Sequence, residues 1–125
     1  MTTLILTHMS GPEDGRTEVI DVGSSNGVAT IGRVVGCSIC IPDDPEASRQ
    51  HAKLSYRDGA WWLEDLGSAN GTFIGEFAQS RKISSAVKLL PGQIFRVGLT
   101  RFKLEKENYQ ISKLKMATHL TTGAA

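Results

Sequence analysis

The fold is decided by a stretch in which apolar and polar residues alternate, and which reads, from residue 52 to residue 65, AKLSYRDGAWWLED. Such alternation suits a β-strand, because successive side chains point to opposite faces of a sheet. Asp58-Gly59 in the middle is a strong signal for a tight hairpin turn. The stretch therefore predicts two antiparallel strands, 52–57 and 60–65, with Trp62 turned outward. The side chains expected to face the core are Ala52, Leu54, Tyr56, Trp61 and Leu63.

The residues on either side of this hairpin form further short apolar runs separated by turn signals. The other expected strands span residues 2–9, 18–22, 29–31, 38–41, 72–74, 81–83, 87–90, 93–97 and 100–105. No stretch before residue 105 keeps a helical period, and Asp43-Asp44-Pro45-Glu46 is expected to form an exposed acidic loop. Many short strands with frequent turns predict an all-β sandwich of two sheets and about eleven strands.

The composition excludes several classes of protein. A chain of 125 residues can form one domain with its own core. It has 14 Lys and Arg against 13 Asp and Glu, a net charge of +1 and a pI of about 7.8. Nucleic-acid-binding domains usually have a pI above about 9, so we expect no nucleic-acid partner. We see no signal peptide and no apolar run near the roughly 20 residues of a membrane span, and expect a cytoplasmic protein without membrane insertion.

Three polar clusters fall between the expected strands. They are Ile31-Gly32-Arg33, Ser48-Arg49-Gln50-His51, and the run DLGSANGT at residues 65–72. Loops at one end of a rigid β-scaffold are a common place for binding residues. An arginine, a loop serine, a histidine and an asparagine before a glycine suit the binding of a phosphate and an extended peptide backbone.

In this order and spacing, on an all-β pattern, the three motifs resemble the forkhead-associated (FHA) domain. The resemblance covers residues 1–105 and implies a SMAD/FHA-like β-sandwich with its binding loops at one end. It also implies a non-catalytic module with no cofactor and no metal. Its partner would be a phosphothreonine-containing protein or peptide in a Ser/Thr kinase pathway.

Four positions match ligand-binding positions of that family. Arg33 matches the phosphate-binding arginine, whose planar guanidinium can meet two phosphate oxygens at once. Ser48 matches a serine that contacts the phosphate through its hydroxyl and backbone amide. Arg49 and Asn70 match positions that contact the main chain of the bound peptide.

Other matched positions are expected to shape the site without touching the ligand. His51 matches a histidine that braces the binding loops by internal hydrogen bonds. The site-structuring residues that the resemblance implies are Gly32, His51, Asp65, Gly67, Ser68, Gly71 and Thr72.

Two positions depart from the family pattern. Ala69 stands where relatives usually have a serine or threonine that can donate a hydrogen bond to the phosphate. Gly75-Glu76 stands where a second asparagine commonly follows the next strand. The first change removes one phosphate donor, and the second is expected to loosen a loop.

Two other functions fit some of these features. The first is a phosphate-independent assembly or scaffold module of the same fold, which the two departures favour; phosphatase treatment of the partner would leave its binding intact. The second is a small Ser/His hydrolase, because Ser48, His51 and Asp65 are the residue types of a catalytic triad. The sequence has no Gly-x-Ser-x-Gly nucleophile elbow, so a hydrolase would have to show ester turnover that Ser48→Ala abolishes.

Two remaining features concern metal binding and domain organisation. Cys37 and Cys40 are spaced like half a zinc site, but an odd offset on a strand points the thiols to opposite faces, and no second pair exists. We expect buried apolar cysteines instead. Residues 106–125 break the strand pattern and are expected to form a linker or flexible tail that could include a short helix.

Overall fold

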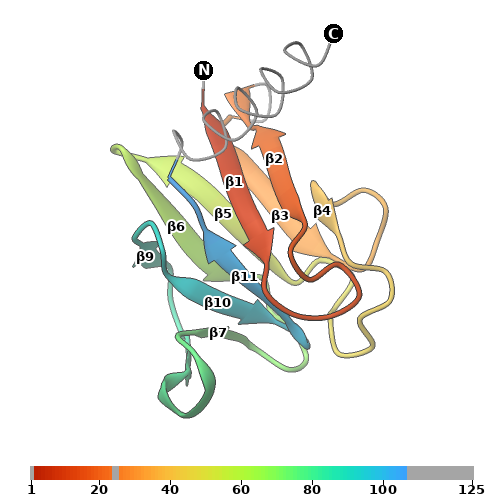
Figure 1. The fold of residues 1–125 in the computed structure, drawn as a ribbon. Coiled ribbons are helices and arrows are strands. Elements are labelled where there is room, and N and C mark those ends of the chain that lie inside the picture. Colours follow the sequence, from red (N-terminus) through yellow and green to blue (C-terminus); the bar gives the residue numbers. More distant parts are fainter. Residues whose placement is uncertain (1, 24–25, 107–125) are drawn as a thin grey trace, which may run out of the picture.

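The computed structural model describes residues 2–23 and 26–106, and these form eleven strands in two sheets (Figure 1). The only other element with assigned bounds is a three-residue 3-10 helix, η2 (Phe77–Gln79). The strands are β1 (Thr3–His8), β2 (Thr17–Asp21), β3 (Val28–Gly32), β4 (Ile39–Cys40), β5 (Ala52–Arg57), β6 (Ala60–Asp65), β7 (Thr72–Ile74), β8 (Arg81–Lys82), β9 (Val87–Leu89), β10 (Ile94–Val97) and β11 (Thr100–Leu104).

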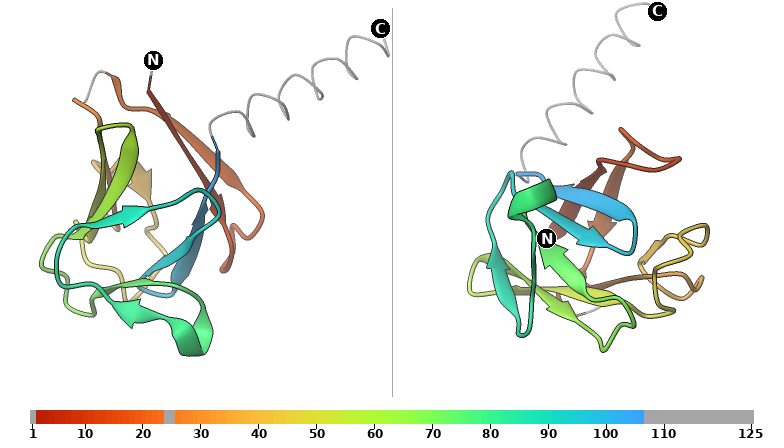
Figure 2. Two further views of the ribbon diagram at one scale, coloured as in Figure 1. Left: turned by 90° about the vertical axis from the view of Figure 1, so that its left-hand side faces the viewer. Right: turned by 90° about the horizontal axis from the view of Figure 1, so that it is seen from below.

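The two sheets face each other across one core, as both views of Figure 2 show. One sheet has the strand order β2-β1-β11-β10-β7-β8, and the other has the order β4-β3-β5-β6-β9. Neighbouring strands are antiparallel except for β3 and β4. The chain changes sheet between β6 and β7, so the loop at residues 66–71 closes one end of the sandwich. The expected all-β sandwich is confirmed.

The core is built by the inward faces of both sheets, as the alternating pattern predicts. Leu54 and Leu63 of the hairpin at residues 52–65 are fully buried, and Trp61 is 9% exposed. Phe95 and Phe102 are fully buried on the facing sheet, with their rings stacked 5.4 Å apart between centroids. The hydrophobic effect of these apolar faces holds the two layers together.

One expectation about a single side chain in the hairpin is wrong. Tyr56 was expected in the core but is 40% exposed. It lies next to the hairpin turn at the end of the sheet, where its cross-strand partner Trp61 takes the buried place. The Tyr56 ring packs edge-on against that indole at 5.1 Å, and its hydroxyl can stay in water. Trp62 faces outward as expected, but it is half-buried beneath Arg57, whose guanidinium lies 4.9 Å from the ring centroid.

Both cysteines were expected to be buried, which is correct for Cys37 and wrong for Cys40. Cys37 is 7% exposed, whereas Cys40 is partly exposed because β4 is a two-residue edge strand. The described residues contain no group of three or more His, Cys, Asp and Glu side chains that could hold a metal ion.

The helix η2 is a further departure, because no helix was expected before residue 105. The described part of the chain has no helix with the length and hydropathy needed to cross a bilayer. A linker or tail was expected at residues 106–125. Of these, only Lys106 is among the described residues.

Candidate functional site

The three polar clusters of the sequence meet at one end of the sandwich because of strand direction. β3 and β6 both pair antiparallel with β5, so β3 and β6 end where β5 begins. The segment after β3, the loop at residues 41–51 before β5 and the loop at residues 66–71 after β6 therefore lie together (Figure 1). Two of these loops are tied to each other by hydrogen bonds.

His51 is the buried centre of this arrangement and has no exposed surface. Its Nδ1 accepts a hydrogen bond from the backbone N–H of Ser48 at 3.0 Å. Its Nε2 donates to the carbonyl oxygen of Gly71 at 2.8 Å. One ring nitrogen accepts and the other donates, so both bonds require the neutral ring with its hydrogen on Nε2. The imidazole thereby joins the loop at residues 41–51 to the loop at residues 66–71.

Two further bonds join the tips of the same loops. The Ser48 hydroxyl oxygen accepts from the Ala69 backbone N–H at 3.0 Å. The Asn70 Nδ2 donates to the Glu46 carbonyl at 3.0 Å. The Ser48 hydroxyl keeps its own proton for another acceptor, and Asn70 keeps its side-chain oxygen for another donor. Both side chains reach the surface, so these unused groups face solvent.

Asp65, the last residue of β6, organises the loop at residues 66–71 that follows it. Its Oδ2 accepts from the backbone N–H groups of Gly67 and Ser68, each at 3.0 Å. Its Oδ1 accepts from the hydroxyls of Ser68 at 2.5 Å and Thr72 at 2.6 Å. Burial opposes ionisation of this carboxyl, but the Ser68 and Thr72 hydrogen bonds outweigh burial and lower its pKa. The Ser68 hydroxyl oxygen also accepts from the Gly71 N–H at 2.8 Å.

Arg33 follows β3 directly and is exposed. Its Nε donates to the Ala47 carbonyl at 2.5 Å, which anchors the side chain beside Ser48. Within the described residues, its terminal guanidinium nitrogens have no hydrogen-bond or salt-bridge partner. Arg49 is also exposed, so two cations border the tied loops.

Gly32 packs closely against the backbone of the loop at residues 41–51. A Cβ built at this position would lie 2.1 Å from the Arg49 carbonyl oxygen, a separation that no real contact has. The backbone N–H of Arg33 bonds the Ser48 carbonyl at 3.1 Å, so the end of β3 presses directly on the loop at residues 41–51. Only glycine allows this approach.

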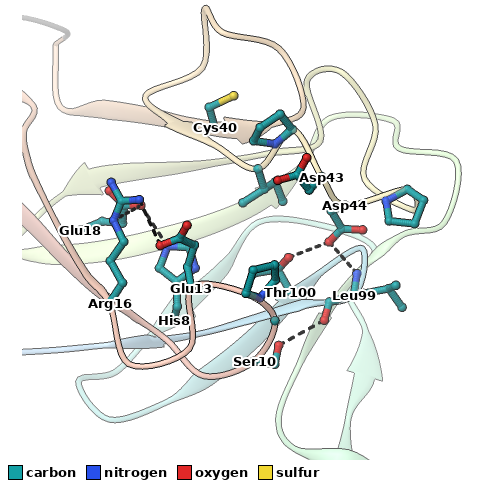
Figure 3. A pocket seen from close by; sticks show the side chains of 15 residues that line it. His8, Ser10, Glu13, Arg16, Glu18, Cys40, Asp43, Asp44, Leu99 and Thr100 are labelled. Atoms are coloured by element: carbon teal, nitrogen blue, oxygen red, sulfur yellow. Dashed lines mark hydrogen bonds and ion pairs between the residues drawn. The ribbon is translucent and has the colours of Figure 1, made fainter.

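Asp44 has a structural role that the local sequence does not indicate: it was expected in an exposed loop but is 6% exposed. Its Oδ2 accepts from the Leu99 backbone N–H at 2.8 Å and from the Thr100 hydroxyl at 2.7 Å, as Figure 3 shows. Its Oδ1 accepts from the Glu46 N–H at 3.0 Å. Only the last bond is local and typical of aspartate in turns. The distant partners, which hold this loop against the β10–β11 turn, leave no signal in the local pattern.

A pocket of about 340 Å³ lies behind Asp44, between the turn after β1 and the start of the loop at residues 41–51 (Figure 3). His8 in its wall is 3% exposed, with Nε2 2.9 Å from Glu18 Oε2. Arg16 in turn approaches Glu18 at 3.7 Å. The His8, Arg16 and Glu18 side chains of the pocket wall thus pair with one another.

The geometry does not form a Ser-His-Asp triad. Both ring nitrogens of His51 are occupied by backbone groups, and its Nε2 lies 3.9 Å from the Asp65 carboxylate. The Ser48 hydroxyl bonds the Ala69 amide instead of the imidazole. No described base is placed to take the hydroxyl proton, which nucleophilic catalysis requires.

Comparison with known proteins places this architecture among its relatives. The FHA domain family model matches residues 29–98. The FHA domain-containing protein FhaB of Mycobacterium tuberculosis is 39% identical over 74 residues, which are 59% of this chain and 44% of FhaB. The chain thus matches less than half the length of that relative.

Two solved structures show the same architecture. The FHA domain of CT664 protein from Chlamydia trachomatis superposes with a TM-score of 0.70 at 28% identity, over 84% of this chain and 98% of that chain. Mycobacterium tuberculosis EmbR, solved in complex with a low affinity phosphopeptide, gives a TM-score of 0.69 at 25% identity. That match covers 84% of this chain and 24% of the EmbR chain.

Proposed function

The chain belongs to the FHA domain family, and from that membership we propose that it is a phosphothreonine-dependent peptide-binding module. It mediates a regulated protein–protein interaction downstream of a Ser/Thr kinase, in the cytoplasm. The binding unit comprises residues 1–105. FHA domains are binding modules, and recognition of a phosphorylated motif by arginine is one of the general modes of peptide recognition.

The observation that carries this proposal is the pair of unused donor groups on Arg33 and Ser48. The guanidinium is anchored through Nε to the Ala47 carbonyl, next to Ser48. Its terminal nitrogens and the serine hydroxyl can then donate to one phosphate. A phosphothreonine carries about 1.5 to 2 negative charges near neutral pH and three strong acceptor oxygens, so charge-assisted hydrogen bonds from these two side chains match it.

Asn70 and Arg49 would hold the peptide main chain on either side of the phosphate. The Asn70 amide is held toward Glu46 through Nδ2, which orients its free oxygen for a peptide N–H. The phosphopeptide complex of the relative EmbR supports this use of the FHA fold.

The first experiment removes the phosphate-binding charge. An oriented phosphothreonine peptide library selects the best ligand, and calorimetry then compares wild type with Arg33→Ala. Loss of one partner of a hydrogen-bonded charge pair costs about 2 to 5 kcal/mol, so affinity should fall by about thirtyfold or more. Arg33→Lys should restore little, because a point charge cannot fork. Arg57→Ala is the control, because Arg57 stacks on Trp62 away from the site; wild-type affinity in Arg33→Ala would refute the assignment.

The second experiment varies the ligand and the pH. Phosphothreonine should bind more tightly than phosphoserine, because a small pocket for one methyl group discriminates by about 1 to 3 kcal/mol. Aspartate should not substitute for either. The second pKa of the phosphate lies near about 6, so affinity should fall between about pH 7 and pH 5 as the dianion is lost. Equal binding of all three peptides, or a flat pH profile, would indicate a simple anion site.

The phosphate-independent module remains a second candidate because Ala69 has no hydroxyl to offer the phosphate. Its backbone N–H bonds the Ser48 hydroxyl, so its side chain starts beside the proposed phosphate position. Ala69→Thr should add a charge-assisted bond worth about 1.5 to 3 kcal/mol, less the cost of any displaced water. We expect several-fold tighter binding of the phosphopeptide alone, and no gain with Arg33→Ala. If unphosphorylated and phosphorylated peptides gain equally, the second candidate is favoured.

A further inference from the structure

The outer face of the six-stranded sheet carries a row of side chains that the proposed phosphate site does not use. In the strand register, Lys82 lies opposite Phe73, Phe73 opposite Arg96, and Arg96 opposite Arg101. Residues directly opposite in an antiparallel sheet share a face. Phe95 precedes Arg96 and is fully buried, so these four residues, here named the basic row, face outward.

The two arginines of the basic row, Arg96 and Arg101, lie directly opposite each other, so their positive charges repel. Like charges directly opposite each other destabilise a sheet. Each guanidinium instead stacks on an aromatic ring: Arg96 lies 4.1 Å from the Phe73 centroid, and Arg101 lies 4.5 Å from the Phe77 centroid. Stacking holds both cations flat against the surface, where their charge stays available.

Both guanidinium groups keep most of their hydrogen-bond donors. Arg96 donates one bond to the Gly98 carbonyl at 2.8 Å, and Arg101 donates one to the Met9 carbonyl at 3.2 Å. A guanidinium has five N–H donors. In residues 2–23 and 26–106, no carboxylate lies within 4.0 Å of the cationic atoms of Lys82, Arg96 or Arg101. The row is therefore a local excess of positive charge on a chain whose net charge is only +1.

The basic row begins at the proposed peptide site. The Lys82 side chain lies across Gly71, since a Cβ built on that glycine would be 2.7 Å from the lysine Cε. Gly71 directly follows Asn70, the residue proposed to hold the peptide main chain. Strands lie about 4.8 Å apart, so Lys82 to Arg101 spans about 14 Å, the length of four or five extended residues.

Phe77 adds an exposed apolar surface at the far end of the row. Its side chain is 73% exposed, and its φ of 47° lies in the left-handed region that residues with side chains rarely adopt. Such strained conformations often mark contact sites. The surface thus offers three cations, two aromatic rings and unused N–H donors in one line that leads away from Asn70.

We propose that the basic row is a docking surface for an acidic segment of the phosphorylated partner, roughly three to eight residues from the phosphothreonine. This inference rests on the proposed function, because it extends the path of the same peptide. Carboxylates would pair with the guanidinium forks of Arg96 and Arg101 and with Lys82. Their contribution would add affinity and specificity to the phosphate contact.

An acidic peptide fits this surface better than other polyanions do. Lipid-binding basic clusters usually hold about four to eight cations, and nucleic-acid-binding domains are usually strongly basic overall. A single row of three cations about 14 Å long matches an extended peptide of four or five residues with alternate acidic side chains.

The test uses the full chain and three phosphopeptides with the same central sequence, taken from the best phosphothreonine library ligand. The first peptide has neutral Gly-Ser flanks. The second has four aspartates in the flank after the phosphothreonine, at the proposed distance of roughly three to eight residues, and the third has them at the same distance before it. Exposed ion pairs each change an equilibrium by up to about fivefold. We expect one acidic peptide to bind wild type about five- to twentyfold tighter than the neutral peptide, with the gain shrinking from about 0.05 M to about 0.5 M salt.

Two variants test whether the basic row provides this gain. In the double variant Arg96→Gln with Arg101→Gln, the gain should vanish while affinity for the neutral phosphopeptide stays the same. Arg57→Gln is the matched control, because that arginine also stacks on an outward aromatic ring but on the other sheet; it should keep the gain. Thermal unfolding checks that all variants fold.

The outcomes separate this inference from the proposed function. If wild type binds the neutral phosphopeptide but the acidic ones no better, or if the gain survives in the double variant, the inference is overturned. If wild type does not bind the neutral phosphopeptide, the proposed function fails first. Equally tight binding of phosphatidylserine vesicles or a single-stranded DNA oligonucleotide, lost in the double variant, would assign the row to a different anion and overturn the peptide inference.

Discussion

Gly32 shows how a single missing side chain positions the site. Its Cα lies so close to the Arg49 carbonyl that a methyl group would have to displace the loop at residues 41–51 or bend the end of β3. Arg33 and Ser48 lie on the two sides of this contact, and their backbones are joined by one hydrogen bond. The geometry that aims the proposed phosphate donors thus depends on a residue that contacts no ligand.

Gly32→Ala should therefore lower the free energy of unfolding by about 1 to 3 kcal/mol, the usual cost of overpacking. Phosphopeptide affinity should fall as well. Gly36→Ala is the matched control, because a Cβ there meets nothing within 4 Å and its φ is not positive. Urea unfolding of both variants checks the prediction, which would be wrong if the two changes cost the same.

The contribution of Asp65 to folding stability should depend on pH. Its pKa is lowered in the folded state, because the Ser68 and Thr72 hydrogen bonds outweigh the burial of the carboxyl. The stabilisation from the ionised carboxylate is thus present above the unfolded-state pKa of about 3.9 and is lost as pH falls through the lower folded-state pKa.

Asp65→Asn should consequently destabilise the protein at pH 7, where an amide cannot accept all of these hydrogen bonds. The gap between the unfolding free energies of variant and wild type should narrow at about pH 3, because the unfolded wild-type chain, with a pKa of about 3.9 at this carboxyl, takes up a proton more readily than the folded chain does. Urea unfolding at the two pH values measures this gap. Asp14→Asn serves as control, since Asp14 is exposed and makes no side-chain hydrogen bond to the described residues; a gap that widens in acid would contradict the assignment.

At the scale of elements, the loop at residues 41–51 behaves as a fixed part of the scaffold. At the end of this loop, His51 bonds the Gly71 carbonyl, and in its middle the Glu46 carbonyl accepts a bond from Asn70. Near its start, Asp44 bonds the β10–β11 turn. A loop held at three points loses little conformational entropy on binding, which favours affinity.

Asp44→Ala should remove one of these ties. It leaves the Leu99 N–H and the Thr100 hydroxyl without their acceptor, and hydrogen bonds to a charged group contribute about 1.5 to 3 kcal/mol. We expect a loss of stability of that size and weaker phosphopeptide binding. Asp43→Ala, at the exposed neighbouring position, should change unfolding by less than about 0.5 kcal/mol. Similar losses in both variants would show that Asp44 is not a structural tie.

At the scale of the whole molecule, the facing apolar layers provide most of the stability. Phe95 and Phe102 lie at the centre of the six-stranded sheet, fully buried and stacked on each other. A domain of this size is stable by only about 5 to 15 kcal/mol, so one large cavity affects the entire fold.

Phe95→Ala should therefore cost about 3 to 5 kcal/mol and lower the stability of all strands together. Phe77→Ala is the contrasting change, because that ring is 73% exposed and should matter little for stability. Denaturant unfolding followed by fluorescence and by circular dichroism tests both points. Two separate transitions, or equal costs for the two phenylalanines, would contradict a single shared core.

Much of this fold was predictable because strand signals are local. The bounds of β5, β6 and β7 agree with the expectation from alternation and turn residues. The Asp58-Gly59 turn has positive φ at both residues, as that dipeptide predicts. By contrast, only Gly71 of the pair Asn70-Gly71 has a positive φ, because this segment crosses between sheets and does not close a hairpin. The all-β fold and the FHA resemblance are confirmed, whereas the ligand roles of the site residues stay predictions.

The sequence by itself determined the strands, the two-layer class and the order of the three polar motifs, since each depends on neighbours within a few residues. Only the tertiary structure decided which distant groups meet. Asp44 bonds Leu99 across 55 residues, His51 bonds Gly71 across 20, and Arg96 faces Arg101 through strand register. Such pairings depend on sheet twist, on strand register and on the packing that buries the apolar faces of the whole chain together. A local pattern of polar and apolar residues does not contain that information.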